Sequence, residues 1–304
     1  MKRKVVKQGS ATYTLSLPAR WVKDFGIKEG DMLDVEESGK ELIVSPELVK
    51  AEKKSEVDVS GFSPSLIRRH ITSLYIRGTD EITMTFSDPK TAKIIQQMTS
   101  SLIGMAVVEQ RRNAVIVKEV SIPKYEEIDS LLRRLFFSIK SFGDESLEKI
   151  REKDLEGLKE MDQIEQYGTN RLAYLCLRIL NKEGYKEFSK TSAVFDTVRF
   201  LENIGDEYWA ICTYMMENKS KLSNETLDIY EQINRVNGEI YAIFYKFDRE
   251  KLDSTYEKLR RFRKTELSKL LSKKPKEETM VLYHLRKISE LMAYILEAVM
   301  IISV

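Results

Sequence analysis

The chain has 304 residues, of which 42% are hydrophobic, so it can bury more than one core and is too apolar to be a disordered protein. Its 50 Lys and Arg residues nearly balance 48 Asp and Glu residues, and the formal net charge is +2. Affinity for a polyanion must therefore come from where the charges lie rather than from their sum. Only two cysteines are present, which excludes a disulfide framework and a cysteine-based zinc site.

We expect neither a signal peptide at the amino terminus nor a membrane-spanning helix at the carboxy terminus. The amino terminus has lysines but no apolar segment. The run from Leu291 to Val304 is interrupted by Glu297 and falls short of the roughly twenty apolar residues that a membrane-spanning helix needs. We therefore expect a cytoplasmic protein without membrane insertion.

Residues 1–46 are expected to form a small domain of short strands around one helix. Apolar and polar residues alternate between Lys4 and Val44, glycines interrupt the alternation, and Pro18 suits the first turn of a helix. The next segment, 47–64, is polar and charged and is interpreted as a linker.

The basic residues of this domain are concentrated at its beginning. The first 23 residues contain six Lys and Arg residues and neither Asp nor Glu, whereas Asp24 to Glu41 holds most of the domain's acids. Contacts of lysine and arginine with phosphate supply most of the sequence-independent affinity for DNA, so a basic end suits nucleic acid. A charged stretch is as often merely a solvated face, and charge alone does not separate these two interpretations.

The order of four motifs points to a family. Lys4–Gly9, Thr14–Trp21, Phe25–Asp31 and Ile43–Pro46 follow one another as they do in the AbrB/SpoVT/MazE family, which this segment resembles along its whole length. The resemblance implies that each chain contributes two β-hairpins around a short helix, and that two chains interleave them into one swapped-hairpin β-barrel. Such a homodimer, which higher oligomers can extend, suits a segment too short to bury a core alone.

The same resemblance assigns a DNA-binding face. The six residues assigned to it are Lys2, Arg3, Lys4, Lys7, Arg20 and Lys23. We expect Arg3 to read a guanine edge, because arginine can bond it with two hydrogen bonds, and the lysines to hold phosphates. The core that the two chains are expected to share comprises Leu15, Leu17, Trp21, Val22, Phe25 and Ile27.

Residues 65–122 are predicted to form a small α+β connector. The spacing of apolar residues predicts helices over Ser65–Ile76 and Pro89–Leu102 and a strand over Glu81–Phe86. A hairpin is expected to turn at Arg112 and Asn113.

Residues 123–304 have apolar residues at three- and four-residue spacing, which predicts an all-α bundle. The segment Leu201–Ile211 lines up with Leu285–Ile295 at an offset of 285 − 201 = 84 residues, which indicates two three-helix repeats over about 123–218 and 222–304. The six helices are expected at about 125–142, 145–180, 185–216, 224–247, 249–271 and 276–304, with a break at Gly143.

Glu202 and Asp206 lie four residues apart, so both carboxylates are expected on one helix face. Paired carboxylate oxygens bind hard or borderline cations, although a lone pair of this kind is more often a solvated acidic face. The motif Leu201–Asp206 within a two-fold repeat of three-helix units resembles the PhoU phosphate-uptake regulators, over about Tyr125–Val304.

The PhoU resemblance implies a divalent or iron-type metal ion in the first repeat. The four ligands that it implies are Asp162, Glu165, Glu202 and Asp206. The alternatives left open are a solvated cluster and one bridged by Arg199 and Arg171. No metal is expected in the second repeat, where the aligned positions are Arg286 and Glu290 and the preceding helix carries the basic run 260–264.

No catalytic residue is assigned. The only histidines, His70 and His284, lie in different units, and the sequence contains neither a phosphate-binding loop nor a nucleophile elbow. We therefore predict a protein that is not an enzyme.

The two resemblances together look like archaeal PhoU-like proteins with an attached AbrB-type domain, and Leu66–Gly78 is similar to the connector of those proteins. They imply a DNA-binding transcriptional regulator of phosphate uptake, whose helical body senses a signal or binds a partner. Two alternatives stay open. One is an adaptor that docks on phosphate-transporter subunits without binding DNA, and the other is an antitoxin-like regulator unrelated to phosphate.

Overall fold

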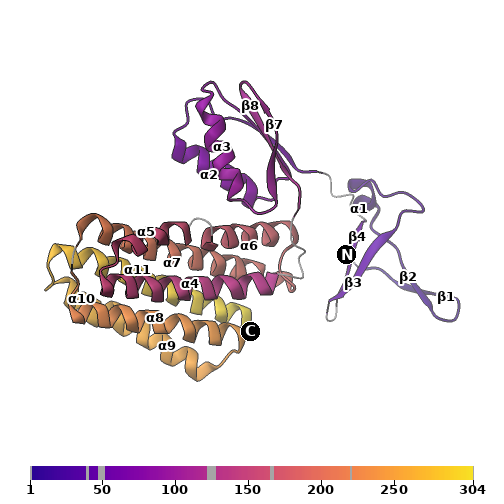
Figure 1. The fold of residues 1–304 in the computed structure, drawn as a ribbon. Helices are drawn as coiled ribbons and strands as arrows, with labels where there is room; N and C mark the ends of the chain where they lie inside the picture. The colour runs from indigo at the N-terminus through magenta and orange to yellow at the C-terminus, as the bar shows by residue number, and fades with distance from the viewer. Residues whose placement is uncertain are drawn as a thin grey trace. The chain divides into compact units, whose positions relative to one another are not determined.

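The computed structural model describes residues 2–38, 41–46, 52–121, 128–164, 168–219 and 221–303 (Figure 1). The chain divides into two units, Met1–Glu52 and Lys53–Val304. The second unit contains both an α+β module and a helical body, so the multidomain α+β class expected from the sequence is confirmed at this level.

The N-terminal unit consists of two separate hairpins and one short helix. Its elements are β1 (Val5–Gln8), β2 (Thr12–Leu15), α1 (Ala19–Asp24), β3 (Leu33–Ser38) and β4 (Glu41–Pro46). β1 pairs with β2 and β3 pairs with β4, both antiparallel, and the two sheets do not join. The predicted β-barrel is therefore not closed by the described residues of a single chain, because each two-stranded hairpin keeps unpaired edges.

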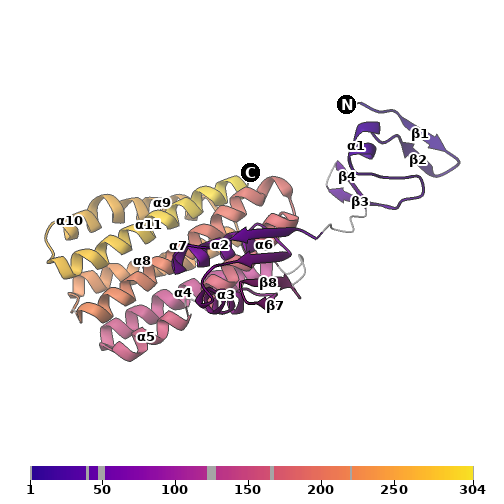
Figure 2. The ribbon, with the colours of Figure 1, turned by 90° about the horizontal axis from the view of Figure 1, so that it is seen from above.

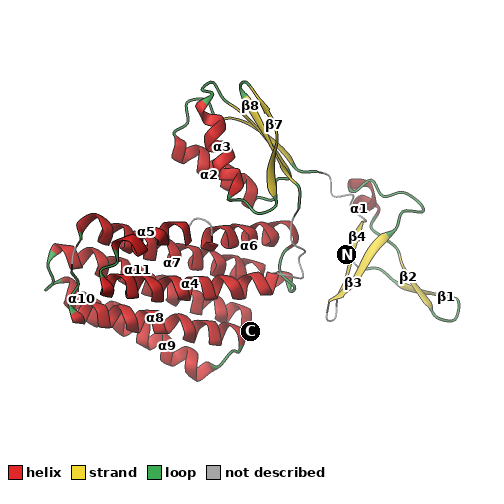
Figure 3. Ribbon diagram, viewed as in Figure 1, coloured by secondary structure: helices red, strands yellow, loops and turns green. Residues whose placement is uncertain are grey.

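Residues 54–119 fold into a four-stranded sheet with two helices on one of its faces (Figure 3). The elements are β5 (Lys54–Asp58), α2 (Pro64–Ile76), β6 (Glu81–Thr85), α3 (Lys90–Ser100), β7 (Met105–Arg111) and β8 (Ala114–Glu119). The strand order is β5-β6-β8-β7; β5 runs parallel to β6, and the other neighbours are antiparallel. The core comprises Ile67, Ile71, Tyr75, Ile82, Met84, Ile95, Val115 and Val117, among others. The helices, the strand and the hairpin predicted within 65–122 are all present.

Strand β5 corrects the predicted linker over 47–64 in its described part; residues 47–51 lie outside the described residues. Its side chains alternate between exposed and half-buried, and Val59, directly after it, is buried. The charged side chains of Lys54, Glu56 and Asp58 all lie on the exposed face. β5 is an edge strand of the sheet. Natural sheets often carry charged side chains on their edge strands, because these charges prevent edge-to-edge pairing with another sheet. A segment that looks like a charged linker is here the solvent face of a strand.

The helical body spans 128–303, and its long helices run roughly parallel or antiparallel to one another (Figures 1 and 2). The first repeat contains α4 (Ile128–Glu152), α5 (Leu155–Ile164), α6 (Asn170–Glu183), the 3-10 helix η3 (Phe188–Lys190) and α7 (Thr191–Asn218). The second contains α8 (Asn224–Tyr245), α9 (Arg249–Arg261), the π-helix η4 (Phe262–Glu266), α10 (Leu267–Leu271) and α11 (Lys276–Ser303). α7 and α11, which carry the two aligned segments, pack against each other. No helix within the described ranges combines the length and apolar composition of a membrane span.

The first repeat departs from the predicted helix ends. α4 continues through Gly143 to Glu152, and the predicted helix 145–180 is divided among the end of α4, α5 and α6. A Cβ atom at Gly143 would lie 2.7 Å from the Tyr208 ring. The glycine therefore allows α4 to approach Tyr208 closely, and it does not end the helix. The chain turns instead at Lys153, which has a φ of 58°.

Candidate functional site

The six cations predicted to face DNA come from two parts of the N-terminal unit. They are Lys2, Arg3 and Lys4 ahead of β1, Lys7 within β1, and Arg20 and Lys23 on α1. All six side chains are exposed. Arg20 Nε lies 3.5 Å from Asp24 Oδ2, but the Arg20 side chain is 93% exposed, so this ion pair is weak and leaves the guanidinium accessible.

The hairpin of β1 and β2 exposes an apolar face beside Lys7. Val5 pairs with Leu15 and Lys7 with Tyr13, and residues that pair across two strands lie on the same face. Val5, Tyr13 and Leu15 are 65%, 66% and 52% exposed. Contiguous exposed apolar side chains rimmed by charge are typical of an interaction surface.

No side chain within 2–35 and 42–46 is buried. Of the six residues expected to form a shared core, Leu17, Trp21, Val22 and Ile27 are half-buried, and Leu15 and Phe25 are exposed. The rings of Trp21 and Phe25 do contact each other, with 5.5 Å between centroids. A single copy therefore does not make the predicted core, since isolated two-stranded hairpins offer too little surface for one.

Glu202 and Asp206 lie one turn apart on α7, as predicted, but in different surroundings. Glu202 is buried and Asp206 is exposed. Tyr174 donates a hydrogen bond from Oη to Glu202 Oε1 at 3.4 Å, and Arg199 Nη1 lies 3.5 Å from Oε2. Burial, and secondly the negative charge of Asp206, raise the pKa of Glu202 to about 7.

The predicted metal cluster is incomplete in the described part of the chain. The side chains of Asp162 and Glu165 lie outside the described residues. Among the side chains that are described, no three metal-binding groups gather at one place. Of the two arginines in the bridged alternative, Arg199 lies beside Glu202.

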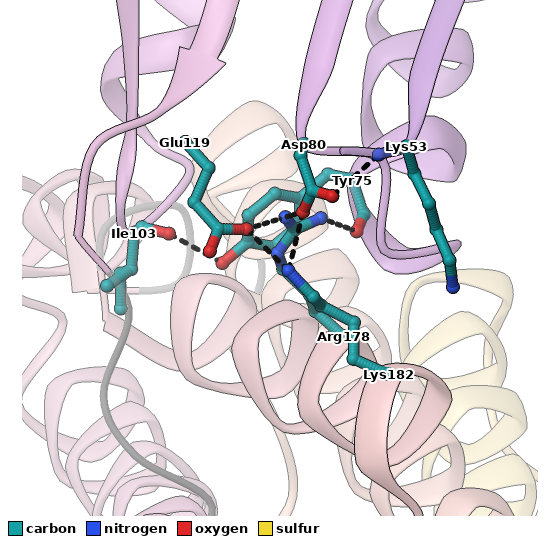
Figure 4. Close-up of polar contacts among 7 residues, drawn as sticks. All are labelled: Lys53, Tyr75, Asp80, Ile103, Glu119, Arg178 and Lys182. Carbon is teal, nitrogen blue, oxygen red and sulfur yellow. Dashed lines mark hydrogen bonds and ion pairs between the residues drawn. The ribbon is translucent and has the colours of Figure 1, made fainter. Parts of the chain in front are cut away.

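Arg178 of α6 joins the helical body to the α+β module (Figure 4). Its side chain has no exposed surface. Nη1 donates to the backbone oxygen of Tyr75 at 2.6 Å, and Nη2 bonds Glu119 and lies 3.4 Å from Asp80 Oδ1. The guanidinium also lies over the Tyr75 ring, 4.8 Å from its centroid, which adds a cation–π contact.

Lys182, one turn further along α6, binds the same two carboxylates. Its Nζ lies 2.6 Å from Asp80 Oδ1 and 2.8 Å from Glu119 Oε2. The other oxygen of Asp80 accepts a hydrogen bond from the backbone N–H of Lys53 at 2.8 Å (Figure 4). Burial opposes ionisation of Asp80, but the hydrogen bonds from Lys182 and Lys53 outweigh it and lower the pKa of this carboxyl. The carboxylate of Asp80 thus binds both Lys182 of the helical body and Lys53, the first residue of the second unit.

This cluster was not predicted from the sequence, although a signal for it exists. Arg178 lies inside the run Leu175–Leu180, and the other members of the run are all buried. Arginine is almost never fully buried without paired carboxylates, so an arginine within an apolar helical run predicts such partners. The identity of those partners depends on the tertiary fold.

The fold and these residues define the class of protein: a small basic hairpin unit joined to an α+β module and a helical body for which the sequence predicts two repeats. Residues 6–54 match the family model described as "Antidote-toxin recognition MazE, bacterial antitoxin", so the N-terminal segment contains a domain of this type, as the sequence indicated. The phosphate transport system regulatory protein PhoU from Streptococcus pneumoniae has a similar solved structure, with a TM-score of 0.48 and 14% identity, covering 58% of this chain and 92% of that chain. A comparison with curated proteins gave no match.

Proposed function

We propose that this protein is a DNA-binding transcriptional regulator that binds DNA as a homodimer through its N-terminal unit. We further propose that the helical body receives a signal connected with phosphate supply. The regulator would act by presenting two copies of the basic face together, because paired DNA-binding units read two half-sites at a fixed spacing.

The observation that carries this proposal is the state of the N-terminal unit in a single chain. Its six predicted DNA contacts are all exposed, and none of its side chains described within 2–35 and 42–46 is buried. A unit with a basic face and no core of its own needs a second copy to become stable. The MazE-type match over residues 6–54 supports the family resemblance from which the pairing and the DNA contact are expected.

The link with phosphate rests on the resemblance of the repeat and its Leu201–Asp206 motif to the PhoU regulators. A bound metal ion is a separate hypothesis. The described side chains supply Glu202 and Asp206, which alone are too few ligands, and the site depends on Asp162 and Glu165. Metal analysis of gently purified protein tests it: absence of Fe, Zn, Mn and Mg, with no thermal shift when they are added, would contradict the metal site.

Binding of the full-length protein to its own upstream DNA tests the central proposal. Fluorescence anisotropy is measured at two salt concentrations. Affinity is expected to be strong near about 50 mM salt and to fall by about 10³-fold or more at about 200 mM, as phosphate contacts require. Negligible affinity at the lower concentration would contradict a role in transcription.

A second candidate is an antitoxin-like regulator without a phosphate connection. The name of the matching family model favours it, since that family is described as recognising a toxin. Co-purification of the full chain with the product of an adjacent gene that inhibits growth when expressed alone is the expected result. Adjacent phosphate-transporter genes, with no such toxin, would favour the first candidate.

A further inference from the structure

A second cluster of cations, distant from the predicted DNA face in the sequence, surrounds a cavity in the second helical repeat. The cavity has a volume of about 730 Å³ and lies between the helices α9 to α10 on one side and α11 on the other. Its cations are Arg260, Arg263, Lys264 and Arg286, and its acids are Glu257 and Glu290. The lining therefore carries a net charge of +4 − 2 = +2.

Most of this positive charge is not neutralised within the protein. Glu257 is used by Arg260, whose Nη1 lies 2.9 Å from Glu257 Oε2. Arg263, Lys264 and Arg286 have no ion-pair partner in the described part of the chain. Among the acids that line the cavity, Glu290 remains to offset these three cations, and it accepts a hydrogen bond from Tyr294 Oη at 3.2 Å.

The local backbone brings these side chains together. The helix that carries Arg260, Arg263 and Lys264 passes through the π-helix η4 (Phe262–Glu266) at this point. The widened turn allows Ser268 Oγ, five residues on, to donate a hydrogen bond to the backbone oxygen of Arg263 at 2.9 Å. Single π-helical turns cost stability relative to a regular helix and are frequently found at functional sites.

The internal repeat gives a second, independent argument. Arg286 and Glu290 of α11 occupy the positions that align with Glu202 and Asp206 of α7 at the offset of 84 residues. The first repeat thus has two acids at the place where the second repeat has an arginine and an acid, faced by three cations of the neighbouring helix. A site suited to cations in one repeat has a counterpart suited to anions in the other.

We propose that this cavity binds a small anion that carries two or more phosphate groups. A single carboxylate would neutralise only one of the three unpaired cations, whereas a di- or triphosphate neutralises all of them. Arginine forks match phosphate oxygens with two hydrogen bonds, and lysine adds a point charge. The cavity is open to solvent, and its volume of about 730 Å³ leaves room for a ligand larger than one inorganic phosphate.

Isothermal titration calorimetry on the full-length protein tests the proposal, with tripolyphosphate and ATP as probes in metal-free buffer at a fixed ionic strength. We expect one site per chain for at least one probe. The double variant Lys264→Gln with Arg286→Gln removes two exposed side chains and is expected to weaken binding by roughly tenfold or more, since it removes charge-assisted hydrogen bonds. Equal affinity for the two probes would assign recognition to the phosphates, and tighter binding of ATP would add the nucleoside.

Two matched variants separate this cavity from other basic surfaces. The variant Lys246→Gln with Arg249→Gln removes the same charge elsewhere on the second repeat, and Arg3→Ala with Lys4→Ala removes it from the N-terminal unit. Both are expected to keep the wild-type affinity for the probes. The proposal would be overturned if neither probe binds or if all three variants lose affinity for the probes equally. Binding only to vesicles of anionic phospholipid would also overturn it.

Discussion

At the scale of single residues, a buried polar network decides how closely three helices approach one another. Tyr208 of α7 donates from Oη to Asn234 Oδ1 at 2.7 Å and accepts from Asn237 Nδ2 at 3.1 Å. Asn234 in turn donates from Nδ2 to the backbone oxygen of Gly143 at 2.6 Å. Because every member of such a network is satisfied only in one arrangement, it specifies the packing of α4, α7 and α8.

Gly143→Ala is expected to lower the free energy of unfolding by about 1–3 kcal/mol, because the new Cβ would displace the Tyr208 ring and strain the network. Gly238→Ala on α8 is the matched control, since its Cβ would meet only Lys140 Cε, at 4.0 Å. That change is expected to be neutral or to stabilise the helix by up to about 1 kcal/mol. Urea unfolding of both variants checks the prediction, and equal effects would refute it.

The raised pKa of the buried Glu202 carboxyl predicts how the stability of the metal-free protein depends on pH. Its folded pKa of about 7 lies above the ordinary value of 4.5, so between these values the folded state keeps a proton that the unfolded state has lost. Stability from this group is therefore present below pH 4.5 and is lost as pH rises toward 7, by about 1.4 kcal/mol per pH unit at most.

The variant Glu202→Gln lacks this titrating group and therefore tests the expected loss of stability as pH rises. Measured in a chelating buffer, the variant is expected to match the wild type near pH 5 and to be more stable than the wild type at pH 8. Chemical denaturation at both pH values gives the comparison. An identical pH dependence of the two proteins would show that burial does not control this carboxyl.

At the scale of secondary-structure elements, α6 connects the α+β module to the helical body through Arg178 and Lys182. Arg178→Met keeps much of the aliphatic volume but removes every hydrogen bond of the guanidinium. Because Asp80 and Glu119 are partly exposed and keep Lys182, we expect a loss of about 2–3 kcal/mol, somewhat less than for a fully buried pair.

The exposed pair of Arg151 and Glu231 supplies the control for that variant, with the Arg151 side chain 43% exposed. Arg151→Met is expected to cost less than about 1 kcal/mol. Hydrogen exchange of the backbone N–H groups at the end of α2 is expected to be faster only in Arg178→Met, since the contact that holds this end of α2 against α6 is lost there. If Arg178→Met costs no more than Arg151→Met, the cluster does not hold the module.

Most of the helices and strands could be predicted from the spacing of apolar residues in the sequence. Apolar spacing located α2, α3, β6 to β8 and most helices of the body, because each of these buries one face. It missed β5, whose charges occupy the exposed face of an edge strand, and it misplaced a helix end at Gly143, where the reason for glycine lies on another helix. Long-range partners such as Asp80 and Arg178 are invisible to local spacing, so the cluster that joins the module to the body could not be predicted.

At the scale of the whole molecule, the account requires two chains. The variant Leu15→Asp places a charge on the apolar face of the first hairpin and is expected to convert a dimer into a monomer, as measured by light scattering, without loss of helical circular dichroism. Phe188→Asp is the control, because Phe188 is 81% exposed on the helical body and is not expected to contribute to pairing. A dimer that survives Leu15→Asp would place the interface elsewhere.

The central claim is that the basic N-terminal hairpin binds DNA, and the salt dependence of binding by Arg3→Ala with Lys4→Ala tests it most directly. We expect affinity for the protein's own upstream DNA to fall by roughly tenfold or more at about 50 mM salt, and the slope of log affinity against log salt to lose about 0.9 for each phosphate contact removed. Lys246→Ala with Arg249→Ala, which removes the same charge from the helical body, should leave both quantities unchanged. Unchanged affinity and slope in Arg3→Ala with Lys4→Ala would contradict the account.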